Sequence, residues 1–237
     1  MSTSNVAVIP GGTGSVGRCL IPLLLDRGFK VAATYLLPEE ATALEEGLDY
    51  DEDRLILRRV DVSDATAVNE FMAEAAEAYG AINVMASLVG GWAGGRDVAE
   101  TSEVRLDRMI DLNLRTAWNT TRASIPLMAE DWGRIILMGS KHALDAPAGQ
   151  AAYNVAKSGV LALAKSVATE LLDTQTTCNA LLPSVINTDA TRAALPYADY
   201  VNWPQPEDIA DVINFLASEQ SKVINGAFIP VWGSALI

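Results

Sequence analysis

Short apolar segments alternate with longer amphipathic segments along the whole chain of 237 residues. Short apolar runs bounded by turn residues predict buried strands, and apolar positions that recur every third or fourth residue predict helices. The pattern predicts strands near 5–9, 30–34, 55–60, 82–88, 134–139, 177–182 and 227–231. It predicts helices near 15–27, 64–79, 103–129, 150–172 and 206–218, with a shorter one around 39–46. This alternation is typical of an α/β fold, a doubly wound parallel sheet of seven strands with helices on both faces.

Composition limits the partners and the compartment. The chain has 17 Lys and Arg against 30 Asp and Glu, a net charge of −13. Such a charge repels nucleic acid and anionic membranes, and no long basic run offsets it, so neither is expected as a partner. The first residues lack the features of a signal peptide, and no apolar run approaches the ~20 residues of a spanning helix. We therefore expect a cytoplasmic protein. No linker, repeat or change of composition divides it, so residues 1–237 are predicted to form one domain.

Cysteine and histidine content argues against a metal site. Cys19 lies in a predicted apolar helix and Cys178 in a predicted apolar strand, which favours buried free thiols. The single histidine, His142, belongs to no Cys/His cluster, so no metal is expected and His142 is assigned no catalytic role.

A glycine-rich segment follows the first predicted strand. The residues PGGTGSVG (10–17) lie between the apolar run NVAVI and an apolar helix. Strand, glycine loop and helix form the context of a dinucleotide-binding fingerprint, in which backbone N–H groups approach a pyrophosphate at the helix N-terminus. The alternative is a glycine-rich turn without a ligand. The candidate binding residues of the loop are Gly11, Thr13, Gly14, Ser15, Val16 and Gly17.

Tyr153 and Lys157 are one helical turn apart, and Ser140 precedes them at the end of a predicted strand. A lysine at i+4 lies on the same face of a helix, and its charge favours the tyrosinate and so lowers the tyrosine pKa. A serine hydroxyl nearby would orient a substrate oxygen while the tyrosine exchanges the proton. By itself a Tyr-x-x-x-Lys pair can arise by chance, as an exposed lysine beside a half-buried tyrosine.

Together, the glycine loop and the Ser…Tyr-x-x-x-Lys constellation resemble the short-chain dehydrogenase/reductase family over the whole chain. The resemblance implies that Asn113, Ser140, Tyr153 and Lys157 are catalytic, with Asn113 holding a water and Lys157 binding the ribose. It implies that Asp61 and Val62 contact the adenine ring, and that the segment from Pro183 to Thr188 lies beside the nicotinamide. The cofactor contacts implied outside the glycine loop are Tyr35, Asp61, Val62, Leu88, Gly90, Tyr153, Lys157, Ile186 and Thr188.

Two positions depart from the family pattern. Ser15 replaces the middle glycine of the loop, and we expect its hydroxyl to cap the helix. The position that usually distinguishes NAD from NADP, at the end of the second strand, is Tyr35, which carries no charge. Arg18 is the candidate cation for a 2′-phosphate. The cofactor is therefore predicted as NAD(H) or NADP(H), with a slight preference for NAD(H).

The run GGWAGG (90–95) and the stretch 195–207 resemble the dihydropteridine reductases, a branch that reduces a quinonoid pterin with NADH. Trp92 is predicted either to stack on the substrate or to anchor a mobile loop. In the family, the stretch corresponding to 189–205 covers the substrate, so Tyr197, Tyr200 and Trp203 are candidate pocket walls; the alternative is packing against a neighbouring subunit.

The complete Asn-Ser-Tyr-Lys set favours hydride transfer between nicotinamide and a carbonyl or secondary alcohol, with Tyr153 as acid and base. One alternative is reduction of a quinonoid dihydropterin or another C=N substrate, and another is a catalytically silent dinucleotide-binding regulator. The expected partners are a small-molecule substrate and further copies of the chain, as a homotetramer or homodimer built from helices 103–129 and 150–172.

Overall fold

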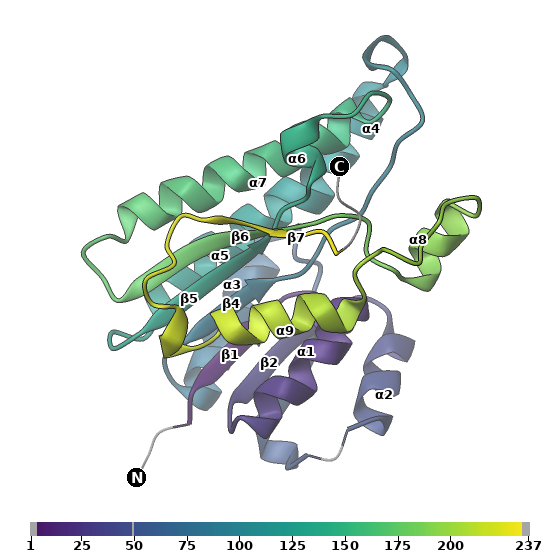
Figure 1. Ribbon diagram of the computed structural model, residues 1–237. Coiled ribbons are helices and arrows are strands. Elements are labelled where there is room, and N and C mark those ends of the chain that lie inside the picture. The colour runs from purple at the N-terminus through teal and green to yellow at the C-terminus, as the bar shows by residue number, and fades with distance from the viewer. Residues whose placement is uncertain (1–3, 49, 234–237) are drawn as a thin grey trace.

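The predicted strands form one parallel sheet in a computed structural model that describes residues 4–48 and 50–233 (Figure 1). Within those residues the sheet has seven strands in the order β3-β2-β1-β4-β5-β6-β7. The chain crosses from β3 back past β1 to β4, so the order reverses beside β1, where ligands bind in open α/β sheets. The strands are β1 (Val6–Ile9), β2 (Lys30–Tyr35), β3 (Leu55–Arg59), β4 (Val84–Ser87), β5 (Gly133–Met138), β6 (Thr176–Pro183) and β7 (Phe228–Val231).

Helices cover both faces of the sheet, which confirms the predicted fold class (Figure 1). Alternate residues of β1 point to opposite faces: Ala7 and Ile9 pack with α1 and α9, and Val8 packs with α3, α5 and α7. A strand buried on both faces must be apolar throughout, as β1 is. The helices are α1 (Ser15–Asp26), α2 (Pro38–Glu46), α3 (Ala65–Tyr79), α4 (Glu103–Ile110), α5 (Thr116–Ser124), α6 (His142–Asp145), α7 (Ala151–Glu170), α8 (Asp189–Ala194) and α9 (Pro206–Leu216).

The predicted helix 103–129 is not one regular helix. A π-helical turn, Asp111–Arg115, joins α4 to α5, and a 3₁₀ turn, Ile125–Leu127, follows α5. Pro126 has no N–H to donate, which explains why the α-helical ladder stops there. Single π turns occur frequently at functional sites, and this one contains Asn113.

The two thiols differ in burial. Cys178 is buried in β6, as predicted, but Cys19 is only half-buried on α1, where its thiol donates to the Ser15 carbonyl at 3.3 Å. The prediction of full burial was wrong for Cys19, because its thiol lies at the exposed edge of the contact between α1 and α9, 3.6 Å from Glu207 Oε1. Of the helices in residues 4–48 and 50–233, none combines the length and apolar character that crossing a bilayer requires.

Candidate active site

The glycine loop joins β1 to α1 in a tight turn. Gly11 has a φ of 78°, a conformation that favours glycine, and its N–H donates to Thr34 Oγ1 at 2.9 Å. A Cβ on Gly17 would lie 2.3 Å from the Gly12 carbonyl oxygen, so the first turn of α1 packs directly on the loop. Gly14 occupies the cap position and Ser15 is the first helical residue. The prediction that the Ser15 hydroxyl caps α1 is therefore wrong.

Two adjoining cavities lie at the carboxyl ends of the strands, and Leu88 and Gly90 line both. The first has a volume of about 720 Å³ and the second about 430 Å³. Every predicted cofactor residue except Ser15 and Gly17 lines one of them. The first includes Gly11, Thr13, Gly14, Tyr35, Asp61 and Val62, and the second includes Val16, Tyr153, Lys157, Ile186 and Thr188. A continuous site of this length, beginning at a glycine loop and a helix N-terminus, fits a dinucleotide.

Ser140, Tyr153 and Lys157 meet in the wall of the second cavity. Ser140 lies two residues beyond the end of β5, and the other two project from α7. The Ser140 side chain interacts with the Tyr153 hydroxyl and acts to lower its pKa, and the Ser140 oxygen accepts from the His142 backbone N–H at 3.2 Å. The Ser140 hydroxyl is therefore oriented from two sides.

The pKa values in this group are governed by burial. Burial raises the pKa of Tyr153, and the hydrogen bond with Ser140 opposes that rise only in part. The Lys157 ammonium is 3% exposed and donates to the Met138 carbonyl at 2.7 Å. Burial lowers the pKa of Lys157 to about 8. The net direction at Tyr153 is thus opposite to the lowering that we expected from Lys157, because desolvation of the phenolate outweighs the other contributions.

Asn113 is buried beneath the two cavities and holds the loop after β4. Its Nδ2 donates to the Gly91 carbonyl at 2.9 Å, and its Oδ1 accepts from the Gly91 N–H at 3.1 Å. A Cβ on Gly90 would lie 3.0 Å from Asn113 Oδ1 and 3.1 Å from Lys157 Nζ. The amide and the ammonium therefore flank Gly90, and a Cβ there would force one or both to shift by a few tenths of an ångström.

One wall of the second cavity contains three side chains that are linked to the catalytic group. Trp92 lines the cavity and its indole N–H donates to Gln150 Oε1. The His142 ring meets the Tyr153 ring edge-on, with 6.1 Å between centroids. Burial lowers the pKa of His142, which favours a neutral imidazole at physiological pH. Sequence reasoning missed Gln150, which no motif marks, and assigned His142 no catalytic role.

The segment 189–205 contributes to the second cavity, but not through its aromatic residues. Thr188 caps α8 by accepting from the Thr191 N–H at 3.1 Å, and the α8 region lines the cavity with Thr191, Ala194 and Leu195. The prediction that Trp203 lines the substrate pocket is wrong. Trp203 packs on the ring of Tyr200, with 5.8 Å between centroids. Tyr197 is exposed to solvent. The α8 region therefore lines the cavity with non-aromatic side chains, and the aromatic residues that follow it are not among the described lining residues.

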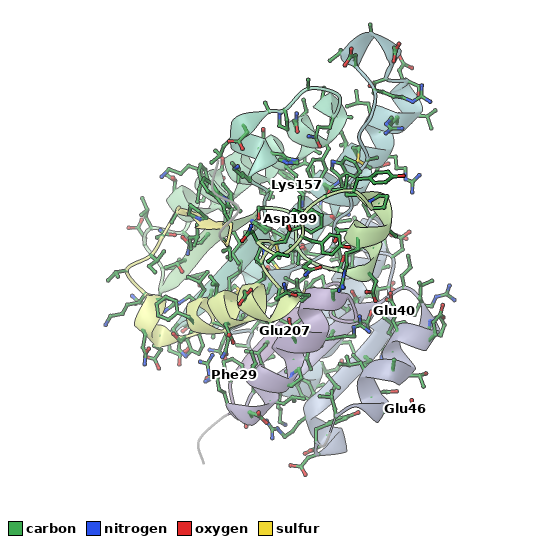
Figure 2. The ribbon with its side chains drawn as sticks, turned by 45° about the vertical axis from the view of Figure 1, so that its right-hand side comes forward. Phe29, Glu40, Glu46, Lys157, Asp199 and Glu207 are labelled. Carbon is green, nitrogen blue, oxygen red and sulfur yellow. The ribbon has the colours of Figure 1, made fainter. Side chains whose placement is uncertain are left out.

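The far end of the first cavity has a carboxylate that sequence reasoning did not identify. Glu40 on α2 lines the cavity, and its Oε2 accepts from Thr13 Oγ1 at 2.9 Å. Glu40 and Lys157, both labelled in Figure 2, belong to different cavities and mark opposite ends of the combined site. Arg18, the predicted candidate cation, is not among the described residues that line either cavity. Within residues 4–48 and 50–233, no three His, Cys, Asp or Glu side chains are grouped so as to hold a metal ion.

Comparisons with known proteins agree with this geometry. The family model described as enoyl-(acyl carrier protein) reductase matches residues 12–233. The chain is 31% identical to 3-oxoacyl-[acyl-carrier-protein] reductase MabA of Mycobacterium tuberculosis, over 97% of this chain and 92% of MabA. It is 32% identical to 2-(R)-hydroxypropyl-CoM dehydrogenase of Xanthobacter autotrophicus, over 98% of each chain. A solved short-chain dehydrogenase/reductase from Serratia marcescens superposes with a TM-score of 0.90, at 26% identity and over 99% of each chain.

Proposed function

The chain belongs to the short-chain dehydrogenase/reductase family and is an NAD(P)(H)-dependent oxidoreductase of that class, and we propose that it interconverts a carbonyl compound and a secondary alcohol. The observation that carries this proposal is the convergence of Ser140, Tyr153 and Lys157 in the wall of one cavity, with Lys157 one helical turn from Tyr153. Each group has a distinct task in carbonyl reduction.

A dinucleotide held by the residues that line the two cavities would supply the hydride for the carbonyl carbon. As negative charge develops on the carbonyl oxygen, the Tyr153 O–H donates its proton to that oxygen, and the product is the alcohol. The Ser140 hydroxyl donates a hydrogen bond to the same oxygen and stabilises the developing charge. Lys157 holds positive charge beside the resulting tyrosinate and accelerates the return of a proton. In the oxidation direction the same groups act in reverse, with Tyr153 as the base.

Tyr153→Phe tests the proton transfer. A phenyl ring keeps the shape of the cavity wall but has no proton to give, so turnover should fall at least about a hundredfold. NADH binding, followed by the fluorescence of the reduced nicotinamide, should change little. A variant that kept more than a few per cent of the parent turnover would exclude Tyr153 as the acid.

The lining of the second cavity supports a small, uncharged substrate. Apart from Lys157, the described residues that line this cavity include no Asp, Glu, Lys or Arg, and most are apolar. A carboxylate or phosphate on the substrate would find no free cation there. The first measurement is therefore the oxidation of NADH and NADPH with a panel of cyclic ketones and diketones, in parallel with matched keto acids. Preferential turnover of the keto acids would contradict this substrate class.

A quinonoid dihydropterin is the second candidate, favoured by Trp92. The indole lies in the cavity wall, and its N–H is fixed by Gln150, so its face is available to stack on a flat heterocycle. Freshly generated quinonoid dihydropterin belongs in the same panel. Fast turnover of the pterin with slow turnover of every ketone would replace the carbonyl proposal.

A groove that shares no lining residue with the two cavities supports the proposed homo-oligomer. The groove has a volume of about 730 Å³ and runs between α5 and α7. Trp118 lies in it and is 52% exposed, although an indole on a monomer surface is usually covered. Arg122 and Glu170 also line the groove, so two copies related by a twofold axis could pair opposite charges across it. Light scattering should show a dimer or tetramer that Trp118→Glu dissociates, and a monomeric parent would contradict the proposal.

A further inference from the structure

The end of β2, where an acidic residue usually binds the adenosine ribose, carries no charge in this chain. Tyr35 ends the strand and Leu36 follows it, and Leu36 is exposed. An NAD-binding site commonly has an Asp or Glu about 20 residues beyond the glycine loop, which accepts a hydrogen bond from the ribose 2′-hydroxyl. Glu40 stands close to that distance in sequence, but on the first turn of α2 instead of the end of β2.

Glu40 is turned back towards the glycine loop. Its Oε2 accepts from Thr13 Oγ1 at 2.9 Å, and Thr13 is only 2% exposed. Its other oxygen, Oε1, makes no hydrogen bond with the residues that the structure describes. The neighbouring Glu39, also in the first turn of α2, is exposed and lines neither cavity. One carboxylate of the pair is therefore built into the site, and the other remains in water.

Apart from Arg108, the other charged residues among the described lining of the first cavity are acidic. Asp61 Oδ1 accepts from the Ser63 backbone N–H at 2.9 Å and from its hydroxyl at 2.7 Å. Asp111 pairs with Arg115 at 2.6 Å. Asp107 also lines the cavity, and among its described lining residues Arg108 is the single Lys or Arg. The cavity as a whole carries negative charge. Glu40 is the acid at its glycine-loop end, and its Oε1 accepts no hydrogen bond from the described residues.

Neither Arg59 nor the N-terminus of α2 offsets this negative charge. Arg59 pairs in register with Tyr35, but its Nε donates to the Leu36 carbonyl at 3.1 Å and it is not among the described lining residues. The N-terminus of α2 would attract an anion, but Glu39 and Glu40 already provide negative charge in its first turn. The 2′-phosphate of NADP(H) would therefore lie close to a carboxylate, whereas its binding requires a cation.

We infer that Glu40, held by Thr13, is the specificity residue of the cofactor site: it accepts a hydrogen bond from the ribose 2′-hydroxyl of NAD(H) and repels the 2′-phosphate of NADP(H). This inference rests on the dinucleotide binding in the proposed function. It goes beyond it by assigning the discrimination to a residue of α2, which acts in place of the missing acid at the end of β2.

The test is equilibrium binding of NADH and NADPH to the parent and to two matched variants, followed by nicotinamide fluorescence. Glu40→Gln removes one charge and keeps the shape of the side chain, and Glu39→Gln removes the same charge from the same helical turn. The parent should bind NADH more tightly. In Glu40→Gln the ratio of the NADPH to the NADH dissociation constant should fall about tenfold, since a carboxylate and a phosphate a few ångströms apart interact at that level even in water. In Glu39→Gln the ratio should stay nearly unchanged.

The dependence of nucleotide binding on salt concentration provides a second measurement. Raising the ionic strength screens the repulsion, so NADPH binding to the parent should improve relative to NADH binding, and in Glu40→Gln this relative gain should be largely lost.

Three results would overturn the inference: a parent that prefers NADPH, a Glu40→Gln variant that weakens both nucleotides equally, or equal effects of the two variants on the ratio. Equal weakening would indicate that Glu40 only supports the loop through Thr13. If the preference for NADH over NADPH depends on Glu40 but no carbonyl compound is turned over, the inference stands and the proposed reaction fails. If neither dinucleotide binds, both fail.

Discussion

Lys157→Met should leave the cofactor-free protein at least as stable as the parent near neutral pH, although it removes a proposed catalytic group. The Lys157 ammonium is 3% exposed and its one hydrogen bond goes to the Met138 carbonyl. Its pKa is lowered from 10.5 to about 8 by burial, which corresponds to a cost of about 3 kcal/mol for folding with the charged form. Methionine fills similar space without charge. It leaves the Met138 carbonyl without this donor, at a cost of roughly 1–3 kcal/mol, so the net gain is roughly 0–2 kcal/mol.

The sharper expectation is the pH dependence of this difference. Because the folded pKa of Lys157 lies below the unfolded one, the unfolded chain binds more protons between about pH 8 and 10.5. The stability of the parent therefore rises with pH across that window through this group, and the variant lacks the effect. The stability of Lys157→Met relative to the parent should fall by about 3 kcal/mol from neutral pH to the top of the window.

Urea unfolding of the cofactor-free parent and variant at about pH 7, 8.5 and 9.5 measures this difference, and other titrating groups cancel in the subtraction. Lys165→Met is the matched control, because Lys165 lies on the same helix with its ammonium exposed, bonded only to the Gly226 carbonyl at 3.4 Å. A difference between Lys157→Met and the parent that does not change with pH would refute the reasoning, as would the same pH-dependent change in the control.

Two further predictions concern the neighbours of the catalytic group. Gly90→Ala places a Cβ 3.1 Å from Lys157 Nζ, so the ammonium must move. Turnover should therefore fall about tenfold or more. The melting temperature should shift only slightly, because the atoms that the Cβ crowds are the terminal atoms of side chains and not backbone atoms. Parent-like turnover would show that the position of Lys157 is not critical. His142 is the chain's one histidine, so an NMR titration of its imidazole needs no assignment. Burial should give a pKa below 6.5, with stability lost as the pH falls through that region, and a value at or above 6.5 would contradict the burial argument.

The errors of sequence reasoning share a cause. Trp203 and Ser15 were assigned by their place in a motif, but the capped turn of α8 and the cap position of Gly14 were decided by local backbone geometry that the motif does not encode. Glu40 was missed because the acid was sought at the end of β2. Its contact with Thr13 spans 27 residues and exists only because α2 packs beside the glycine loop.

The sequence by itself determined the features that depend on local spacing. Alternating apolar runs are sufficient to predict seven strands with helices between them. A separation of four residues is sufficient to place Tyr153 and Lys157 on one face of α7. Only the tertiary structure decided how these parts act on one another. The π turn around Asn113, the burial that lowers the pKa of Lys157 to about 8, and the position of Glu40 all arise from contacts between segments far apart in the chain. Burial and charge are properties of the surroundings of a side chain, and those surroundings exist only when the sheet and its helices are assembled.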